Sequence, residues 1–234
     1  MNKDEFLKEL NKKDINLKEN QINQFEVFCK ELLNYNQHTN LTAITETSEV
    51  YLKHFFDSSL LATSINFNEI STMLDIGCGA GFPGIVIKIL YPHLKLTLLD
   101  SNNKKTKFCQ YIVNKLNLKD VEIINERAEI YIDKKREYYD LVTARAVKDL
   151  QILTELSIPY VKINGFFIAM KSDCKIELEN SLRGITLLGG KYIETKKIEN
   201  YINLGQREFI IIKKINKTSI KYPRNYSKIV KQPL

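Results

Sequence analysis

The chain has 234 residues, 44% of them hydrophobic, which suits one large domain or one domain with an extension. It has no apolar run near the ~20 residues that span a bilayer, and its first 20 residues are too charged for a secretory signal. Four cysteines without a Cys-x-x-Cys pair predict reduced thiols in a cytoplasmic protein, and three scattered histidines argue against a metal site.

The net charge of +7 is concentrated in the last 22 residues. Residues 213–234 hold seven basic residues and no acidic one, so residues 1–212 are formally neutral. A block of this kind is often a solvated tail. Tyr222 and Tyr226 lie among its charges, however, and basic segments with aromatic residues also suit nucleic-acid contacts. Both interpretations stay open.

Residues 1–64 predict a helical extension that packs on the remaining chain. Asp4–Leu10 and Lys18–Tyr35 have helical spacing, and the polar stretch Asn34–Asn40 predicts a break. A third helix follows, with Thr47 or Ser48 as its cap. This third helix carries Lys53 and His54, and we favour a packed helix histidine over a catalytic one.

From Thr72 the pattern changes to alternating strands and helices, which predicts a doubly wound α/β sheet with ligands at the carboxyl ends of its strands. The short gap Asn203–Arg207 before the last strand predicts an antiparallel pair. We expect a core over residues 65–215 and a basic tail over residues 216–234. The predicted strands are Thr72–Ile76, Leu94–Leu99, Val121–Ile124, Tyr139–Thr143, Phe166–Met170, Lys191–Ile198 and Glu208–Ile212. The predicted helices between them are Ile85–Tyr91, Asn102–Leu116, Asp149–Tyr160 and Glu177–Leu188.

A glycine-rich loop follows the first strand and precedes a helix. The stretch Met73–Gly84 reads Met-Leu-Asp-Ile-Gly-Cys-Gly-Ala-Gly-Phe-Pro-Gly. Glycines allow left-handed backbone and let a ligand lie against bare main chain. The spacing Gly79-x-Gly81-x-x-Gly84 also matches a dinucleotide fingerprint. We favour S-adenosylmethionine (SAM), because Asp75 before Gly77 and Gly79 suits a cationic sulfonium and an amino-acid tail better than a phosphate.

Polar residues follow the next three strands. Asp100 ends the second strand, where a carboxylate accepts hydrogen bonds from ribose hydroxyls; it could also cap the next helix. Ala128 and Glu129 follow the third strand, at the place of an adenine-contacting loop. Arg145 ends the fourth, and we expect it to pair with an acid of the site or with the cofactor's carboxylate.

Two features that the sequence lacks at this position limit the class of atom that can accept the methyl group. The segment at Arg145 has no Asn-Pro-Pro-Tyr motif of the kind found in amide and amino-group methylases, and no cysteine nucleophile for attack on a ring carbon. The acceptor is then an atom that is already nucleophilic. Guanine N7 is one such atom, and its methylation needs in-line positioning rather than a general base.

Motifs along nearly the whole chain resemble the bacterial small-subunit ribosomal RNA methyltransferase G family, also called glucose-inhibited division protein B. The motifs are Asn40-Leu41-Thr42-Ala43-Ile44, Tyr51-Leu52-Lys53-His54-Phe55 with Asp57-Ser58, Asp75–Gly84, Leu98-Leu99-Asp100-Ser101, Arg127-Ala128-Glu129, Arg145-Ala146, Gly205-Gln206-Arg207 and Tyr222-Pro223-Arg224. The resemblance implies a Rossmann-like, SAM-dependent fold with a mostly parallel seven-stranded sheet, an antiparallel final strand and N-terminal helices.

The resemblance also implies a reaction, methylation of guanine N7 in 16S ribosomal RNA. It implies cofactor contacts at Gly77, Phe82, Ala128, Glu129 and Arg145. We further expect Arg145 and Arg127 to act in catalysis by positioning. The expected RNA contacts are Lys53, His54, Lys171, Arg207, Lys221 and Arg224.

Other functions remain open on the sequence alone. The chain could methylate another RNA or a small molecule, use a dinucleotide in a reduction, or bind RNA without catalysis. A non-enzymatic module does not explain why Asp75, Asp100 and Arg145 fall at successive strand ends. We expect a monomer that acts on ribosomal RNA or the small subunit, away from membranes.

Overall fold

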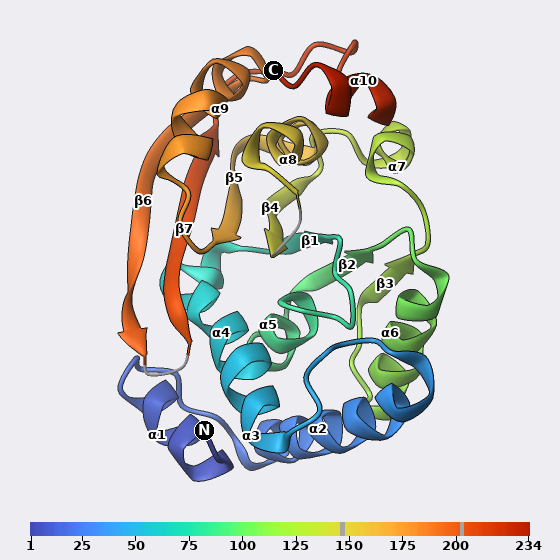
Figure 1. The fold of residues 1–234 in the computed structure, drawn as a ribbon, viewed down its shortest axis with the longest axis vertical. Coiled ribbons are helices and arrows are strands. Elements are labelled where there is room, and N and C mark those ends of the chain that lie inside the picture. Colours follow the sequence, from blue (N-terminus) through green and yellow to red (C-terminus); the bar gives the residue numbers. More distant parts are fainter. Residues whose placement is uncertain (146–147, 202–203) are drawn as a thin grey trace.

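The computed structural model describes residues 1–145, 148–201 and 204–234. Within these residues a seven-stranded sheet forms the centre, with the strand order β3-β2-β1-β4-β5-β7-β6 (Figure 1). Strands β3 to β5 of this order pair in parallel, and β7 pairs antiparallel with both β5 and β6. The predicted fold class is therefore confirmed. The strands are β1 (Thr72–Ile76), β2 (Lys95–Leu99), β3 (Val121–Ile124), β4 (Tyr139–Arg145), β5 (Val161–Lys171), β6 (Gly190–Tyr201) and β7 (Gly205–Lys214).

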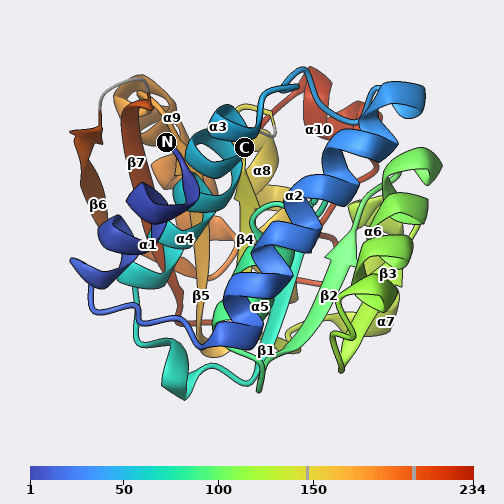
Figure 2. The same ribbon diagram turned by 90° about the horizontal axis from the view of Figure 1, so that it is seen from below.

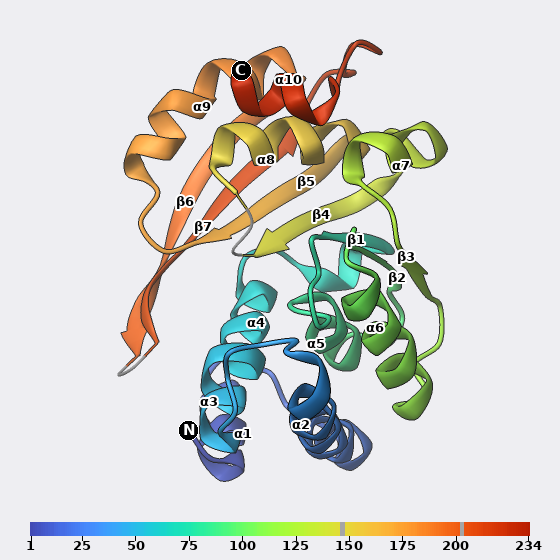
Figure 3. The ribbon, with the colours of Figure 1, turned by 45° about the vertical axis from the view of Figure 1, so that its right-hand side comes forward.

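Helices cover both faces of this sheet. Figure 3 shows α2, α4, α5 and α6 on one side and α7, α8, α9 and α10 on the other. None of the helices in the described ranges is long and apolar enough to cross a membrane. The α-helices are α1 (Lys3–Asn11), α2 (Glu19–Thr39), α3 (Thr47–Glu49), α4 (Asp57–Ser59), α5 (Gly84–Leu90), α6 (Asn103–Lys115), α7 (Ala128–Lys135), α8 (Leu150–Ser157), α9 (Lys175–Leu187) and α10 (Tyr226–Lys231).

The core divides into two clusters because successive strand residues point to opposite faces. Met73 and Leu141 belong to the cluster under α2, α5 and α6, whereas their neighbours Leu74 and Val142 belong to the cluster under α7 to α9. The first cluster also contains Phe6 and other buried residues of the N-terminal helices. The segment 1–64 thus shares its core with the sheet. The predicted boundaries at 64/65 and 215/216 stay predictions.

Helix α2 is longer than predicted and runs across α5 and α6 (Figure 2). The side chain of Gln21 donates to the carbonyl of Ile89, with 2.6 Å between nitrogen and oxygen. The predicted break at Asn34–Asn40 is wrong, since the helix continues to Thr39. Asn36 is buried, and its side-chain amide exchanges two hydrogen bonds with the backbone of Thr42. A partner outside the helix therefore makes a polar residue acceptable within it.

The predicted third helix is a composite of several helical forms. A short α3 leads into a π-helical segment over Val50–Phe56, which α4 and a 3-10 turn over Leu60–Thr63 follow. The cap is Glu46, which makes no side-chain capping bond, so the prediction of Thr47 or Ser48 is wrong by one or two positions. π-helical turns are rare and are frequently found at functional sites.

The last two strands and the C-terminal tail also differ from the prediction. β6 and β7 are longer than predicted, and residue 203 of the expected connection lies outside the described residues. The tail is not a solvated chain: it contains α10, capped by Asn225, and buries Tyr222 and Ile229 in the second core cluster. Arg224 anchors it by pairing with Glu155, a carboxylate buried on α8. The solvated-tail interpretation is therefore wrong.

Candidate active site

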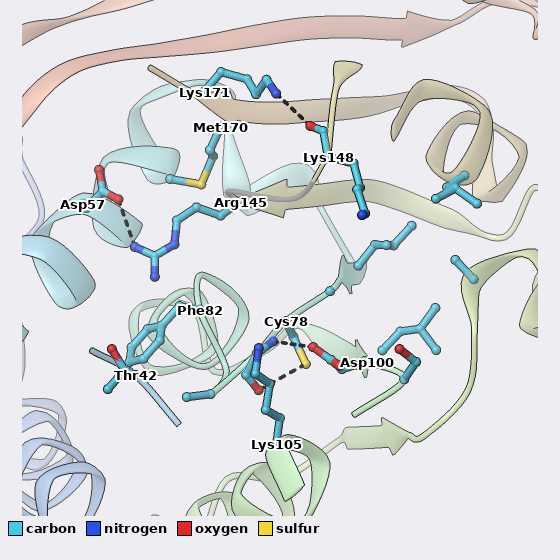
Figure 4. A pocket seen from close by; sticks show the side chains of 18 of the residues that line it. Thr42, Asp57, Cys78, Phe82, Asp100, Lys105, Arg145, Lys148, Met170 and Lys171 are labelled. Atoms are coloured by element: carbon cyan, nitrogen blue, oxygen red, sulfur yellow. Dashed lines mark hydrogen bonds and ion pairs between the residues drawn. The ribbon is translucent and has the colours of Figure 1, made fainter. Parts of the chain in front are cut away.

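A cavity of about 1290 Å³ opens at the carboxyl ends of the parallel strands (Figure 4). Pockets for a single small ligand usually measure roughly 300–1000 Å³, so this one has room for a cofactor and part of a second molecule. One wall is the glycine loop after β1, and the facing wall carries the basic side chains at the ends of β4, β5 and β7. Residues that line the cavity include Thr42, Lys53, His54, Asp57, Gly77, Cys78, Gly79, Phe82, Asp100, Lys105, Arg127, Ala128, Glu129, Arg145, Lys148, Met170, Lys171, Arg207 and Tyr226.

The glycine loop is held in a conformation that most residues avoid. Gly77, Gly79 and Gly81 have φ angles of 67°, 57° and 95°, in the left-handed region. The Gly77 nitrogen donates to the Leu99 carbonyl at 2.7 Å, which ties the loop to β2. A Cβ on Gly81 would meet Ile85 at 2.3 Å, whereas one on Gly79 would have only the Lys105 Nζ, 4.0 Å away. The loop therefore packs tightly at Gly81 and presents a bare backbone cradle at Gly79.

Asp75 lies behind this loop and is not among the residues that line the cavity. Its side chain is fully buried, and Oδ2 accepts a hydrogen bond from the Gly84 nitrogen at 2.8 Å. Its Oδ1 has no partner among the described residues. Burial raises the pKa of Asp75 to about 7, against the opposing effect of the Gly84 hydrogen bond. The position shows Asp75 holding the turn into α5.

Asp100 lines the cavity next to the cradle. Its Oδ2 accepts from the Gly79 nitrogen at 2.9 Å and its Oδ1 from the Asn102 nitrogen at 2.8 Å. The suggestion that Asp100 also caps the following helix is wrong, because Asn102 is the N-cap of α6 and accepts from Lys104 and Lys105. Each carboxylate oxygen has a further lone pair. Asp100 thus fixes the loop and can still accept hydrogen bonds from a ligand.

Ala128 and Glu129 line the cavity at the start of α7, not in a loop as predicted. The N-cap residue Arg127 provides no side-chain cap, so the first N–H groups of α7 are available to a ligand. The Arg127 guanidinium lies 3.6 Å from Glu129 and 5.2 Å above the ring centre of Tyr226. Through Tyr226 the tail itself reaches the cavity wall.

Arg145 is held by three acceptors from the π-helical segment and its C-terminal end. Its Nη1 donates to the Lys53 carbonyl and to Asp57 Oδ2, both at 2.9 Å, and its Nη2 lies 3.1 Å from His54 Nδ1. The expectation that Arg145 pairs with an acid of the site is confirmed, and the acid is Asp57.

His54 forms a stack with Phe82 beside this arginine. The two rings are 4.3 Å apart and nearly parallel, and Phe28 stacks on the other side of Phe82 at 5.2 Å. Arginine only donates, so Nδ1 of His54 is the acceptor and the proton lies on Nε2, 3.0 Å from the Thr42 hydroxyl. Burial, together with the charge of Arg145, lowers the pKa of His54 to about 3. This is a neutral, packed histidine, as the sequence favoured.

The other basic residues expected to contact RNA divide into two groups. Lys53, Lys171 and Arg207 line the cavity, and each is paired with a carboxylate: Glu49, Glu177 and Asp57 respectively. Lys221 and Arg224 are not among the lining residues. Lys221 is exposed, whereas Arg224 is used in the bond to Glu155.

Several residues of the site were missed by the sequence analysis. Asp57 is the clearest, with a side chain only 5% exposed and both oxygens bonded to arginines. A carboxylate between the apolar pairs Phe55-Phe56 and Leu60-Leu61 was a usable signal, because a buried charge needs a partner. Lys105 and Lys148 also line the cavity, and no local pattern singled them out. Thr42 and Tyr226 line it as well; the sequence analysis named Thr42 only as part of a family motif and Tyr226 only as an aromatic residue of the basic tail.

Comparison with known proteins identifies the family. The sequence profile of the family described as rRNA small subunit methyltransferase G matches residues 21–210. The chain is 42% identical over 237 residues to the "Ribosomal RNA small subunit methyltransferase G" of Bacillus subtilis, covering 100% of this chain and 99% of that one. The chain belongs to the rRNA small subunit methyltransferase G family. The protein of the same name from Bacillus cereus is 44% identical, over 96% of this chain and 95% of its own.

A solved structure shows the same fold at low sequence identity. A SAM-dependent O-methyltransferase of Thermotoga maritima superposes with a TM-score of 0.53 and 15% identity, covering 80% of this chain and 72% of that one. The family makes the chain a methyltransferase whose cofactor is SAM. The dinucleotide interpretation of the glycine spacing is therefore wrong, because the same spacing here belongs to a methyltransferase loop.

Proposed function

We propose that this protein transfers the methyl group of SAM to N7 of a guanine in small-subunit ribosomal RNA. The family supports the RNA substrate, since its relatives carry that substrate in their names. The observation that carries this proposal is that the titratable groups beside Arg145 are already held by neighbouring residues. Both oxygens of Asp57 accept from arginines, and both ring nitrogens of neutral His54 are engaged. Neither is a free general base, which suits an acceptor atom with no proton to lose.

The cofactor fits the wall that carries the glycine loop. The cradle at Gly79 is open where a side chain would stand, and Gly77 adopts the same left-handed backbone. SAM supplies an electrophilic methyl group on a sulfonium. On this wall Gly77, Gly79 and Phe82 would hold the amino-acid end of the molecule, while Asp75 keeps the loop in place from behind.

The adenosine half of the cofactor suits the neighbouring elements. Asp100 retains lone pairs for the ribose hydroxyls, and Ala128 and Glu129 present the start of α7 to the adenine. These elements are adjacent because β1, β2 and β3 are neighbours in the sheet. The contacts repeat the sequence prediction, with α7 in place of a loop.

The acceptor base suits the opposite wall. Arg145 and Arg207 lie there with Lys171, and Lys148 also lines this part of the cavity. A concentration of cations next to the cofactor attracts the RNA backbone and orients the nucleotide. Arg145 is fixed by three acceptors, so it positions rather than exchanges protons. Arg127, which lies over the ring of Tyr226, also lines the cavity. The monomeric state and the cytoplasmic location stay predictions of the sequence.

The experiment uses SAM labelled on its methyl group with deproteinised small-subunit RNA and with assembled subunits, both lacking the modification. Borohydride and aniline treatment then cleaves RNA at N7-methylguanosine. We expect label in RNA and one cleavage site. Label without cleavage moves the acceptor to another atom, and label only in a small molecule favours a metabolite methyltransferase.

A variant that tests the cofactor site is Gly79→Asn. Asparagine tolerates the left-handed φ of 57° at this position, and its side chain would fill the cradle without meeting packed atoms. We expect this variant to fold and to lose SAM binding, measured by calorimetry, together with transfer. Unchanged SAM affinity would show that the cofactor lies elsewhere.

A further inference from the structure

Asp57 connects two arginines that are both far from it in the sequence. Its Oδ2 accepts from Arg145 Nη1 at 2.9 Å and its Oδ1 from Arg207 Nε at 2.7 Å. The three residues lie on α4, at the end of β4 and on β7. Asp57 is therefore the only carboxylate among the described residues that bridges β4 and β7 at the cavity wall.

The π-helical segment prepares a second contact for Arg145. At its end the Asp57 nitrogen donates to the carbonyls of His54 and Leu52. An α-helical bond would run instead to the carbonyl four residues back, which is that of Lys53. The wider turn leaves the Lys53 carbonyl for Arg145, which bonds it at 2.9 Å. The π-helical geometry thus makes a backbone carbonyl available to hold an arginine of the cavity wall.

After these contacts, Arg145 and Arg207 still have N–H groups that a substrate can bind. Arg145 uses three of its five N–H donors on the Lys53 carbonyl, Asp57 and His54, within the described residues. Arg207 uses Nε on Asp57 and Nη1 on the Gln206 carbonyl. The remaining donors of both guanidinium groups belong to side chains that line the cavity. One carboxylate offsets two cations, so the wall keeps a positive charge.

We propose that Asp57 is the positioning residue of the methyl-transfer site: it holds Arg145 and Arg207 at one fixed separation, so that their remaining N–H groups bind the nucleotide that accepts the methyl group. This inference rests on the proposed function. A carboxylate shared by two arginines sets both guanidinium planes at once, and small misplacements in such sites cost large factors in rate. Asp57 touches neither reacting group in this scheme.

The test compares Asp57→Asn and Asp57→Glu with Asp140→Asn. Asp140 is a matched control, because it is also buried, lies near the other end of β4 and accepts from the backbone nitrogens of Ser71 and Thr72. We expect both Asp57 variants to lower kcat by about 10- to 100-fold with SAM affinity within about twofold. Asp140→Asn loses stability but keeps kcat.

Asp57→Glu separates position from charge. It keeps the carboxylate and shifts it by one methylene, so a role in charge balance alone predicts a normal kcat. A nitrogen-15 NMR spectrum of the arginine side chains gives a readout that does not depend on activity. The Nε–H of Arg207 should exchange slowly in the wild type and in Asp140→Asn, and fast in Asp57→Asn.

The outcomes distinguish the two proposals. Normal kcat in both Asp57 variants, with fast Arg207 exchange, overturns the positioning role. Slow exchange in Asp57→Asn overturns the contact itself. If the wild type labels no RNA, the proposed function falls, while the NMR signal still decides whether Asp57 holds Arg207.

Discussion

Among the residues that the structure describes, two buried carboxylates bind arginines, and they have different roles. Asp57 shares its oxygens between Arg145 and Arg207 beside the cavity. Glu155, fully buried on α8, takes the whole fork of Arg224: Nε at 2.8 Å and Nη2 at 2.5 Å, with the backbone nitrogen also at 2.8 Å. From the sequence, Arg207 and Arg224 were both expected to contact RNA, and Arg145 was expected to contact the cofactor and to act in catalysis.

The difference lies in where each arginine is placed. Arg224 donates through Nε and Nη2 to Glu155 and to the Gln232 carbonyl, within the tail and its anchor, and it is not among the residues that line the cavity. Arg145 and Arg207 line the cavity, where their remaining N–H groups can meet a ligand. A bidentate bond to one buried acid thus builds structure, whereas two arginines on one acid build a wall that still has groups for a ligand.

The largest expected effect comes from Arg224→Ala. It leaves Glu155 buried and without its ion pair, so we expect the free energy of unfolding to fall by about 3–5 kcal/mol, measured by urea denaturation. Transfer per folded molecule should stay within about twofold. Lys228→Ala, exposed on the same tail, is the control, with an expected change under ~0.5 kcal/mol. If the Arg224→Ala protein kept its stability but bound RNA more weakly, Arg224 would be an RNA contact and not an anchor of the tail.

The second effect concerns Arg145→Lys. A lysine keeps the charge but cannot reach three acceptors as a planar fork does. We expect kcat to fall by about 100-fold. Stability should change less than in Arg224→Ala, because Asp57 keeps its bond to Arg207. Kinetics at saturating SAM, with SAM affinity from calorimetry, measure both.

Arg136→Lys serves as the control for this substitution, since Arg136 donates to the Tyr222 carbonyl and is not among the lining residues. If Arg145→Lys weakens SAM binding and leaves kcat at saturation unchanged, Arg145 acts as a cofactor contact only. That result would remove the arginine from the acceptor side of the cavity.

The third effect is a pH dependence of stability that arises at His54, the histidine that accepts a hydrogen bond from Arg145. The pKa of His54 is about 3 in the folded protein, below its ordinary value of 6.5. The unfolded chain therefore binds more protons between these values, and stability falls as pH drops from about 6.5 toward 3, by at most ~1.4 kcal/mol per pH unit. Asp75, with its pKa raised to about 7, contributes with the opposite sign.

His54→Asn isolates this contribution. Asparagine offers an acceptor near Nδ1 and does not titrate, while Asp75 is unchanged and cancels in the difference. We expect the stability difference between wild type and variant to shrink as pH falls from 6.5 to 5. A difference that is constant with pH means that Arg145 does not hold the histidine neutral.

The smallest effect is expected at Lys221 in the tail. This lysine is exposed and has no acidic partner among the described residues, so Lys221→Gln should leave stability within ~0.5 kcal/mol. If it meets an RNA phosphate, as the sequence predicts, the slope of log affinity against log salt falls by about 0.7. Lys8→Gln on α1, at the opposite end of the molecule from α10 (Figure 1), is the control. Equal slopes in both variants would restrict RNA binding to the cavity side.

Much of the cofactor wall follows from local sequence. Strand, glycine loop and helix succeed each other without interruption, and the left-handed glycines occur where the spacing predicted a tight loop. Asp100, Ala128 and Arg145 were placed together from sequence alone, because parallel strands bring their carboxyl ends to one edge of the sheet. The position of this part of the site therefore follows from the order of the strands along the chain.

The partners of the charged side chains were decided by the tertiary structure alone. Asp57 meets Arg145 and Arg207 across 88 and 150 residues, and Arg224 meets Glu155 across 69. Hydrophobic periodicity predicts that a helix has a buried face, but it does not say which strand end lies beside one of its carboxylates. The sequence therefore determined the glycine loop and the order of strands, while packing of the N-terminal helices and the tail decided which arginines line the cavity and which one holds the tail to the core.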